Sequence, residues 1–148
     1  MKKLILLAFI MLLNACATVP MTSVEESNKA KQFPDPGKQK SGLYIYRNSF
    51  IGYALKKDLY IDGKFIGESA PNVFFYKKIA PGQHKISTES EFSNNDINLT
   101  TEGGKNYFIR QYIRFGVFVG QAGLEVVPET KGKAEVSKLN MAKSIVDN

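Results

Sequence analysis

The sequence predicts a mainly β fold, namely a small antiparallel β-sandwich of seven to eight short strands with a short C-terminal helix. Aromatic and β-branched residues concentrate between residues 43 and 127, and such side chains favour sheets over helices. Gly, Pro, Asn and Asp residues divide this region into short segments. Apolar and polar residues alternate along several of these segments, as they do on a half-buried strand.

The first expected strand is the apolar segment 43–46. The next two, 59–61 and 64–66, are separated only by Asp62 and Gly63. Asp-Gly between two apolar segments is typical of a type I′ turn, because both central residues of that turn need a positive φ. The sequence therefore predicts a β-hairpin closed by Asp62 and Gly63.

The later strands are separated by turn residues such as Pro81-Gly82 and Gly103-Gly104. The expected strands here are residues 73–79, 83–89, 97–101, 107–115 and 124–127. Beyond them, an apolar residue recurs every three positions with lysines between, at Val136, Leu139, Ala142 and Ile145. This spacing predicts a short amphipathic helix within residues 131–148.

The first 15 residues have the anatomy of a secretion signal. Lys2 and Lys3 precede a ten-residue apolar run at 4–13, and small residues then lead to Cys16, the one cysteine of the chain. A membrane-spanning helix needs about 20 apolar residues, so this run is too short to cross a bilayer. The segment therefore indicates export, with residues 1–15 as a cleaved signal peptide.

The sequence LNAC at residues 13–16 resembles the lipobox of bacterial lipoproteins. The resemblance implies that the Cys16 thiol carries diacylglycerol and that the new amino group is acylated. Several acyl chains hold a protein stably on a lipid bilayer, which makes that bilayer the first expected partner. The expected location is the bacterial cell envelope. In a Gram-negative source, Ala17 after the cysteine favours the outer membrane, facing the periplasm.

The domain organisation follows from these boundaries. Residues 16–40 are polar and interrupted by prolines, so we expect a lipidated N-terminus and a flexible tether, although Glu25 and Lys29 are spaced as in a short helix within 23–32. Residues 41–130 form the expected β-sandwich domain, and 131–148 the C-terminal helix and tail. The processed chain has 18 basic and 14 acidic residues. The basic residues are scattered, which suits a solvated surface, or anionic lipid headgroups and acidic glycans; no nucleic acid is expected as a partner.

Several segments together resemble a known family. They are LYIYR at 43–47, LYIDGKFIG at 59–67, APGQHKI at 80–86, GGKNYFIR at 103–110 and LEVVPE at 124–129. Their order and spacing resemble the bacterial lipoprotein family catalogued as domain of unknown function 2846, over roughly residues 42–139. The hairpin and the Pro-Gly-x-His turn also resemble PEGA-type β-domains of envelope proteins. The resemblance implies a membrane-tethered β-domain with no assigned catalytic residues.

Candidate chemistry is sparse, so no catalytic residue, metal or cofactor is expected. His84 is the one histidine, and without a nucleophile or ligand partners we expect it to be a structural, hydrogen-bonded residue. Glu89 and Glu91 are the carboxylates that an envelope hydrolase acting on glycan or lipid would use. Residues 94–96, Asn-Asn-Asp, suit calcium but lack the spacing of a dedicated loop, so we expect a turn there.

The most unusual segment is YIRFGVFVGQAG at residues 112–123, which is apolar and rich in glycine. It is either a core strand continuing into a glycine-rich loop or an exposed loop that contacts a partner. The residues of that possible contact loop are Phe115, Val117, Phe118 and Val119. The sequence thus favours a lipid-anchored, non-enzymatic accessory or binding module, with an envelope protein or glycan as partner. The alternative is the carboxylate-dependent hydrolase.

Overall fold

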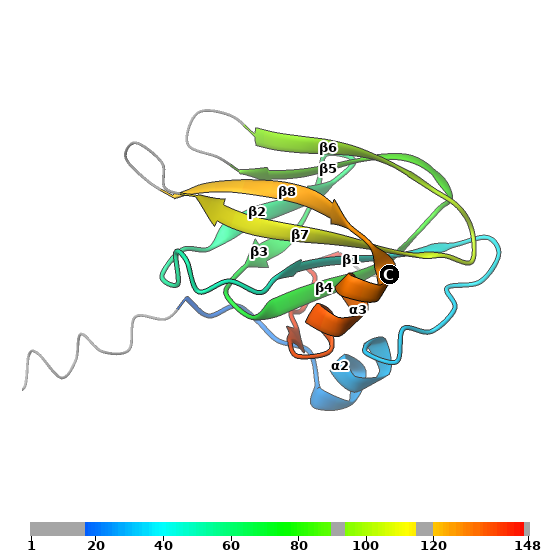
Figure 1. The fold of residues 1–148 in the computed structure, drawn as a ribbon, viewed down its shortest axis with the longest axis horizontal. Helices are drawn as coiled ribbons and strands as arrows, with labels where there is room; N and C mark the ends of the chain where they lie inside the picture. The colour runs from blue at the N-terminus through cyan, green and yellow to red at the C-terminus, as the bar shows by residue number, and fades with distance from the viewer. Residues whose placement is uncertain (1–16, 90–93, 115–119, 147–148) are drawn as a thin grey trace, which may run out of the picture.

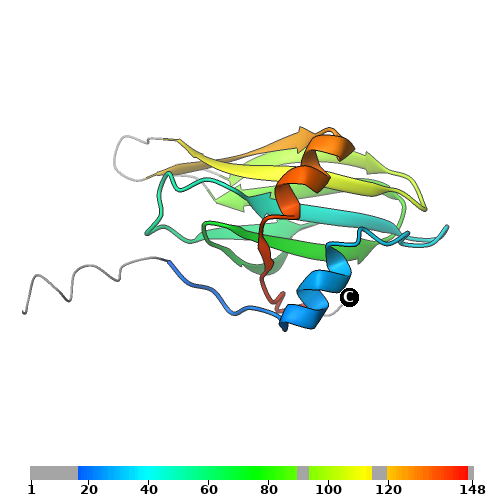
Figure 2. The ribbon, with the colours of Figure 1, turned by 60° about the horizontal axis from the view of Figure 1, so that its bottom comes forward.

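The structure is a computed structural model and describes residues 17–89, 94–114 and 120–146. In these residues nine strands form two sheets, which pack face to face, and two short helices lie on one outer face (Figures 1 and 2). The predicted mainly β sandwich is therefore confirmed.

One sheet has five strands and the other four. The five-stranded sheet, in the order β8-β7-β1-β4-β9, comprises β1 Ser41–Arg47, β4 Val73–Ile79, β7 Asn106–Arg114, β8 Gln121–Val127 and β9 Asn140–Met141. The four-stranded sheet, in the order β3-β2-β5-β6, comprises β2 Lys57–Ile61, β3 Lys64–Ser69, β5 Gly82–Glu89 and β6 Asn94–Thr101. All pairs in the four-stranded sheet are antiparallel, whereas β1 pairs with β7, and β4 with β9, in parallel.

Strand β1 lies at the centre of the five-stranded sheet and is buried on both faces. Leu43 and Ile45 point between the sheets, and Tyr44 and Tyr46 point to the outer face. The inner core consists of Leu43, Ile45, Leu59, Ile61, Ile66, Val73, Phe75, Ile86, Leu99, Ile109, Leu124 and Ala142. The outer core consists of Ala30, Tyr44, Tyr46, Phe74, Phe108, Val127, Val136 and Leu139. Burial on both faces explains why the β1 sequence is apolar without a strict alternation.

The hairpin between β2 and β3 confirms the turn predicted from Asp-Gly. Asp62 and Gly63 have φ angles of 51° and 77°, and the strands on either side pair in antiparallel register. Both angles are positive, as a type I′ turn requires.

The structure differs from the flexible tether that we predicted within residues 16–40, and it contains the short helix that the sequence allowed within 23–32. Helix α2 spans Val24–Ala30 and begins with a capping box in which Ser23 and Glu26 bind each other's backbone amides. Its last residue, Ala30, is buried in the outer core, where Phe33 packs beside it. The physical reason is that these few apolar side chains find a matching aromatic surface on the sheet, which the polar composition of the segment conceals.

The C-terminal segment also differs from its prediction. Helix α3 spans Glu129–Val136 and ends there, and residues 140–141 form β9. Leu139 lies in the outer core whereas Ala142 lies in the inner core, on the other side of the sheet. After helix α3 the chain pairs with β4 as strand β9 and does not form a further turn of helix. The three-residue spacing therefore places apolar side chains on both faces of the sheet, not on one face of a helix.

Candidate functional site

Several predicted site residues lie outside the residues that the structure describes. They are Cys16, Glu91, Phe115, Val117, Phe118 and Val119. Ala17, the residue bonded to Cys16, is described, and its amide donates a hydrogen bond of 3.0 Å to the Tyr53 carbonyl oxygen. Arg114 and Gln121, which flank the possible contact loop, pair across β7 and β8.

His84 links the β2–β3 hairpin to the turn before β5. Its Nδ1 lies 2.7 Å from the Asp62 carboxylate, and its Nε2 lies 2.7 Å from the Ala80 carbonyl oxygen. Both partners are hydrogen-bond acceptors, so both ring nitrogens of His84 are engaged within the fold. This geometry supports the structural role predicted for His84.

Asp62 makes the hairpin sensitive to acid. Burial raises the pKa of Asp62, but hydrogen bonds from His84 and the Lys85 amide outweigh burial and bring this pKa below its ordinary value. A carboxyl whose pKa is lower in the folded state stabilises the fold above its unfolded pKa, and this contribution is lost as the pH falls through the folded pKa.

We therefore expect Asp62→Asn to have a lower free energy of unfolding than the wild type at about pH 5. Between about pH 5 and about pH 3, this free energy should fall less in the variant than in the wild type. The difference should be below about 1 kcal/mol, because the Asp62 side chain is 45% exposed and solvent screens it. Urea unfolding of both proteins at the two pH values measures it. Equal acid sensitivity in both proteins would show that Asp62 does not carry this pH dependence.

The two carboxylates that the alternative hydrolase would use are not both described by the structure. Glu89 is paired with the buried Lys57 at 3.3 Å, and Glu91 lies outside the described residues. The turn predicted at residues 94–96 is wrong, because these residues begin β6, where Asp96 pairs with Lys85 at 3.3 Å. Residues 94–96 are part of an extended strand paired with β5, so the backbone there does not form a calcium loop.

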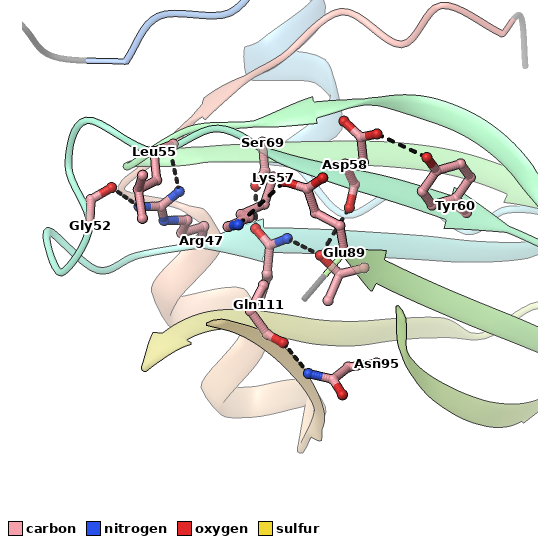
Figure 3. Close-up of polar contacts among 12 residues, drawn as sticks. Arg47, Gly52, Leu55, Lys57, Asp58, Tyr60, Ser69, Glu89, Asn95 and Gln111 are labelled. Carbon is pink, nitrogen blue, oxygen red and sulfur yellow. Dashed lines mark hydrogen bonds and ion pairs between the residues drawn. The ribbon is translucent and has the colours of Figure 1, made fainter. Parts of the chain in front are cut away.

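A chain of buried polar side chains crosses the sandwich (Figure 3). Ser69 donates to the Gln111 side-chain oxygen, and the Gln111 amide donates to the Thr88 hydroxyl at 2.7 Å. Thr88 in turn donates to the Asp58 carbonyl oxygen at 2.9 Å. A nucleophilic serine needs an adjacent base, and an amide oxygen is not one. The chain therefore ties β7 to the opposite sheet and does not activate Ser69.

Arg47, at the end of β1, is buried inside the loop that follows it (Figure 3). Its guanidinium donates to the carbonyl oxygens of Leu55 at 2.8 Å, Ile51 at 3.0 Å and Gly52 at 2.6 Å. Burial lowers the pKa of Arg47 to about 10. Three carbonyl groups thus take the place of water around the cation, and the cation holds the loop in one conformation.

A groove of about 540 Å³ lies between α2, β4 and the C-terminal segment. Four lysines and the acid Glu26 line it; these lysines are Lys29, Lys77, Lys78 and Lys143. Lys29 is paired with Glu25 at 3.0 Å, and Lys77 donates to the Val146 carbonyl oxygen. Met21, Tyr76 and Met141 supply apolar walls. A groove with apolar walls and an excess of cations suits an anionic ligand.

Sequence reasoning missed Arg47, Gln111 and the groove. Arg47 and Gln111 lie within strand-forming segments, and an isolated polar residue there reads equally well as a surface position. The groove is built from residues within 21–34, 76–78 and 141–146, three segments that only the fold brings together. The capping sequence Ser23-x-x-Glu26 was the signal for α2.

Neither a metal centre nor a spanning helix occurs among the described residues. No three His, Cys, Asp or Glu side chains in ranges 17–89, 94–114 and 120–146 gather closely enough to hold a metal ion. No helix in the described part of the chain is long and apolar enough to cross a membrane.

Comparison with known proteins identifies one family and one relative. The model of the family described as "Protein of unknown function (DUF2846)" matches residues 37–123, from just before β1 into β8. A Haemophilus influenzae protein, described as uncharacterized, is 75% identical over 134 residues, which cover 90% of this chain and 80% of the relative. No solved structure matches the chain.

Proposed function

The chain belongs to DUF2846, a family of proteins of unknown function, and we propose that it is a lipid-anchored cell-envelope lipoprotein whose β-sandwich is a non-enzymatic binding module. The observation that carries the anchor is the one cysteine of the chain, placed directly after a short apolar signal in the sequence LNAC. Acylation of Cys16 would attach the sandwich to a bilayer without a spanning helix. Ala17 after the cysteine favours the outer membrane.

The binding role is supported by how the polar side chains are used. The hydroxyls of Ser69 and Thr88 and both ring nitrogens of His84 are engaged in hydrogen bonds within the fold. Glu89 is engaged with Lys57. The groove beside α2, with its four lysines, is the surface that we propose for an anionic component of the envelope, such as an acidic glycan.

The anchor is tested by labelling cells with an alkyne analogue of palmitate and by intact mass spectrometry of the purified protein. We expect a labelled chain that begins at Cys16 and partitions into detergent. We expect a Cys16→Ser variant to be unlabelled. Because the chain has no second cysteine, no other thiol can account for the label. An unlabelled wild type, or one that retains residues 1–15, would contradict the anchor.

The binding role is tested by placing a photo-reactive amino acid at Lys78, which lines the groove, in intact cells. The matched control is the same amino acid at Lys64, which is exposed on the β2–β3 hairpin and does not line the groove. We expect an adduct from position 78 only, and expect Lys143→Glu to reduce it. Equal adducts from both positions would contradict the groove, and turnover of a glycan or lipid by the purified protein would favour the hydrolase.

A further inference from the structure

The loop between β1 and β2 exposes three large apolar side chains close together. Phe50 is 73% exposed, Ile51 51% and Tyr53 55%. Of the eight exposed large apolar side chains among the described residues, these three lie within four positions of the chain. Monomeric proteins seldom leave such side chains clustered in water unless the surface contacts something apolar. We refer to Phe50, Ile51 and Tyr53 as the apolar rim.

The apolar rim is held from beneath by the fold. The guanidinium of Arg47 binds the carbonyl oxygens of Ile51 and Gly52, on the side of the loop that faces the sandwich. The Ser49 hydroxyl accepts from the Ile51 amide at 3.1 Å, and the Leu55 amide donates to the Gly52 carbonyl at 2.8 Å. The loop thus directs its polar groups inward and leaves its apolar side chains outside.

The apolar rim lies where the chain leaves the sandwich toward Cys16. The Ala17 amide donates to the Tyr53 carbonyl oxygen at 3.0 Å, so the first described residue is bonded to the rim itself. Both ribbon views show the start of the N-terminal segment beside this loop (Figures 1 and 2). Cys16 is covalently joined to Ala17, and consecutive Cα atoms lie about 3.8 Å apart.

We propose that the apolar rim is a lipid-facing surface that sits in the interface of the bilayer to which the protein is anchored. This inference rests on the proposed acylation of Cys16. With no spacer between Cys16 and Ala17, acyl chains on Cys16 would bring Phe50, Ile51 and Tyr53 to the membrane surface. Aromatic and aliphatic side chains are favoured there, because they leave water while polar groups stay at the headgroup level. The rim then fixes the orientation of the sandwich on the membrane.

The test uses a single tryptophan as a depth probe, because the chain contains none. Phe50→Trp places the probe on the rim. Val126→Trp is the control, since Val126 is 54% exposed and lies near the C-terminal end of β8, outside the rim. The full acylated chain is reconstituted in vesicles of phosphatidylethanolamine and phosphatidylglycerol, with or without acyl-brominated lipid. For a side chain ~5–10 Å into the interface, bromine should reduce Phe50→Trp emission about twofold and leave Val126→Trp unchanged.

The outcomes separate this inference from the proposed anchor. If mass spectrometry shows an acylated chain bound to the vesicles while Phe50→Trp is not quenched, the lipid-facing rim is wrong and the anchor stands. If Cys16 is not acylated but Phe50→Trp is quenched on added vesicles, the rim is supported and the anchor fails. If the tryptophan is shielded from water in intact cells but is neither shielded nor quenched by brominated lipid in vesicles, the rim contacts a protein partner. That result would overturn the lipid assignment. Tyr53→Trp repeats the test if Phe50→Trp does not fold.

Discussion

Replacing Arg47 with Met is expected to lower the free energy of unfolding by about 3 kcal/mol, because three loop carbonyl groups lose a charged donor. Methionine fills much of the same space but donates no hydrogen bond, so the effect isolates the polar contacts. Urea denaturation of the two proteins measures the loss.

Arg47→Lys is the matched control for charge. An ammonium group keeps the cation but lacks the planar fork of donors that reaches Leu55, Ile51 and Gly52 together. We expect an intermediate loss of stability. If Arg47→Met unfolds at the wild-type urea concentration, then burying the guanidinium costs as much as its hydrogen bonds contribute, and the loop is held by its own turns.

Replacing Tyr44 with Ala is the second large effect, with an expected loss of about 3–5 kcal/mol, as for other buried aromatic residues. The Tyr44 ring is fully buried and stacks on Tyr76 and Phe108, with centroids 4.5 Å and 4.9 Å away. Its hydroxyl donates to the Ala30 carbonyl oxygen at 2.9 Å, and Phe33 packs against its ring. The substitution should therefore weaken both the outer core and the docking of α2.

Tyr44→Phe separates these two roles. It keeps the ring and removes only the hydrogen bond to Ala30, for an expected loss of about 1 kcal/mol. Limited proteolysis provides the local measurement: in Tyr44→Ala, cleavage within residues 17–40 should precede cleavage of the sheets. Simultaneous cleavage of both regions would mean that α2 and the sandwich unfold as one unit.

The parts of the fold that the sequence predicted are those decided by neighbouring residues. Asp62-Gly63 selects its turn because the two residues tolerate positive φ, whatever the rest of the chain does. The alternation in β7 places Ile109 in the inner core and Phe108 in the outer core. Such local preferences recur in strand after strand, and they were sufficient to predict a mainly β sandwich.

The parts that could not be predicted depend on distant partners. The parallel pairing of β1 with β7 joins residues more than 60 positions apart, and neither strand sequence specifies its neighbour. Helix α2 docks because Ala30 and Phe33 pack against aromatic rings on the sheet. Its position therefore depends on this contact and not on its own sequence. Arg47 reads as an ordinary surface arginine until the loop carbonyls are seen around it. The candidate site was therefore less predictable than the fold.

The two ends of the described chain are hydrogen-bonded to each other at the edge of the five-stranded sheet. Thr22 donates to the Met141 carbonyl oxygen, Lys143 donates to the Pro20 carbonyl oxygen, and β9 pairs with β4 between them. This edge cannot close until the last ten or so residues are available. A chain shortened before residue 140 would therefore leave the edge of β4 without its paired strand and residues 20–22 without these two hydrogen bonds.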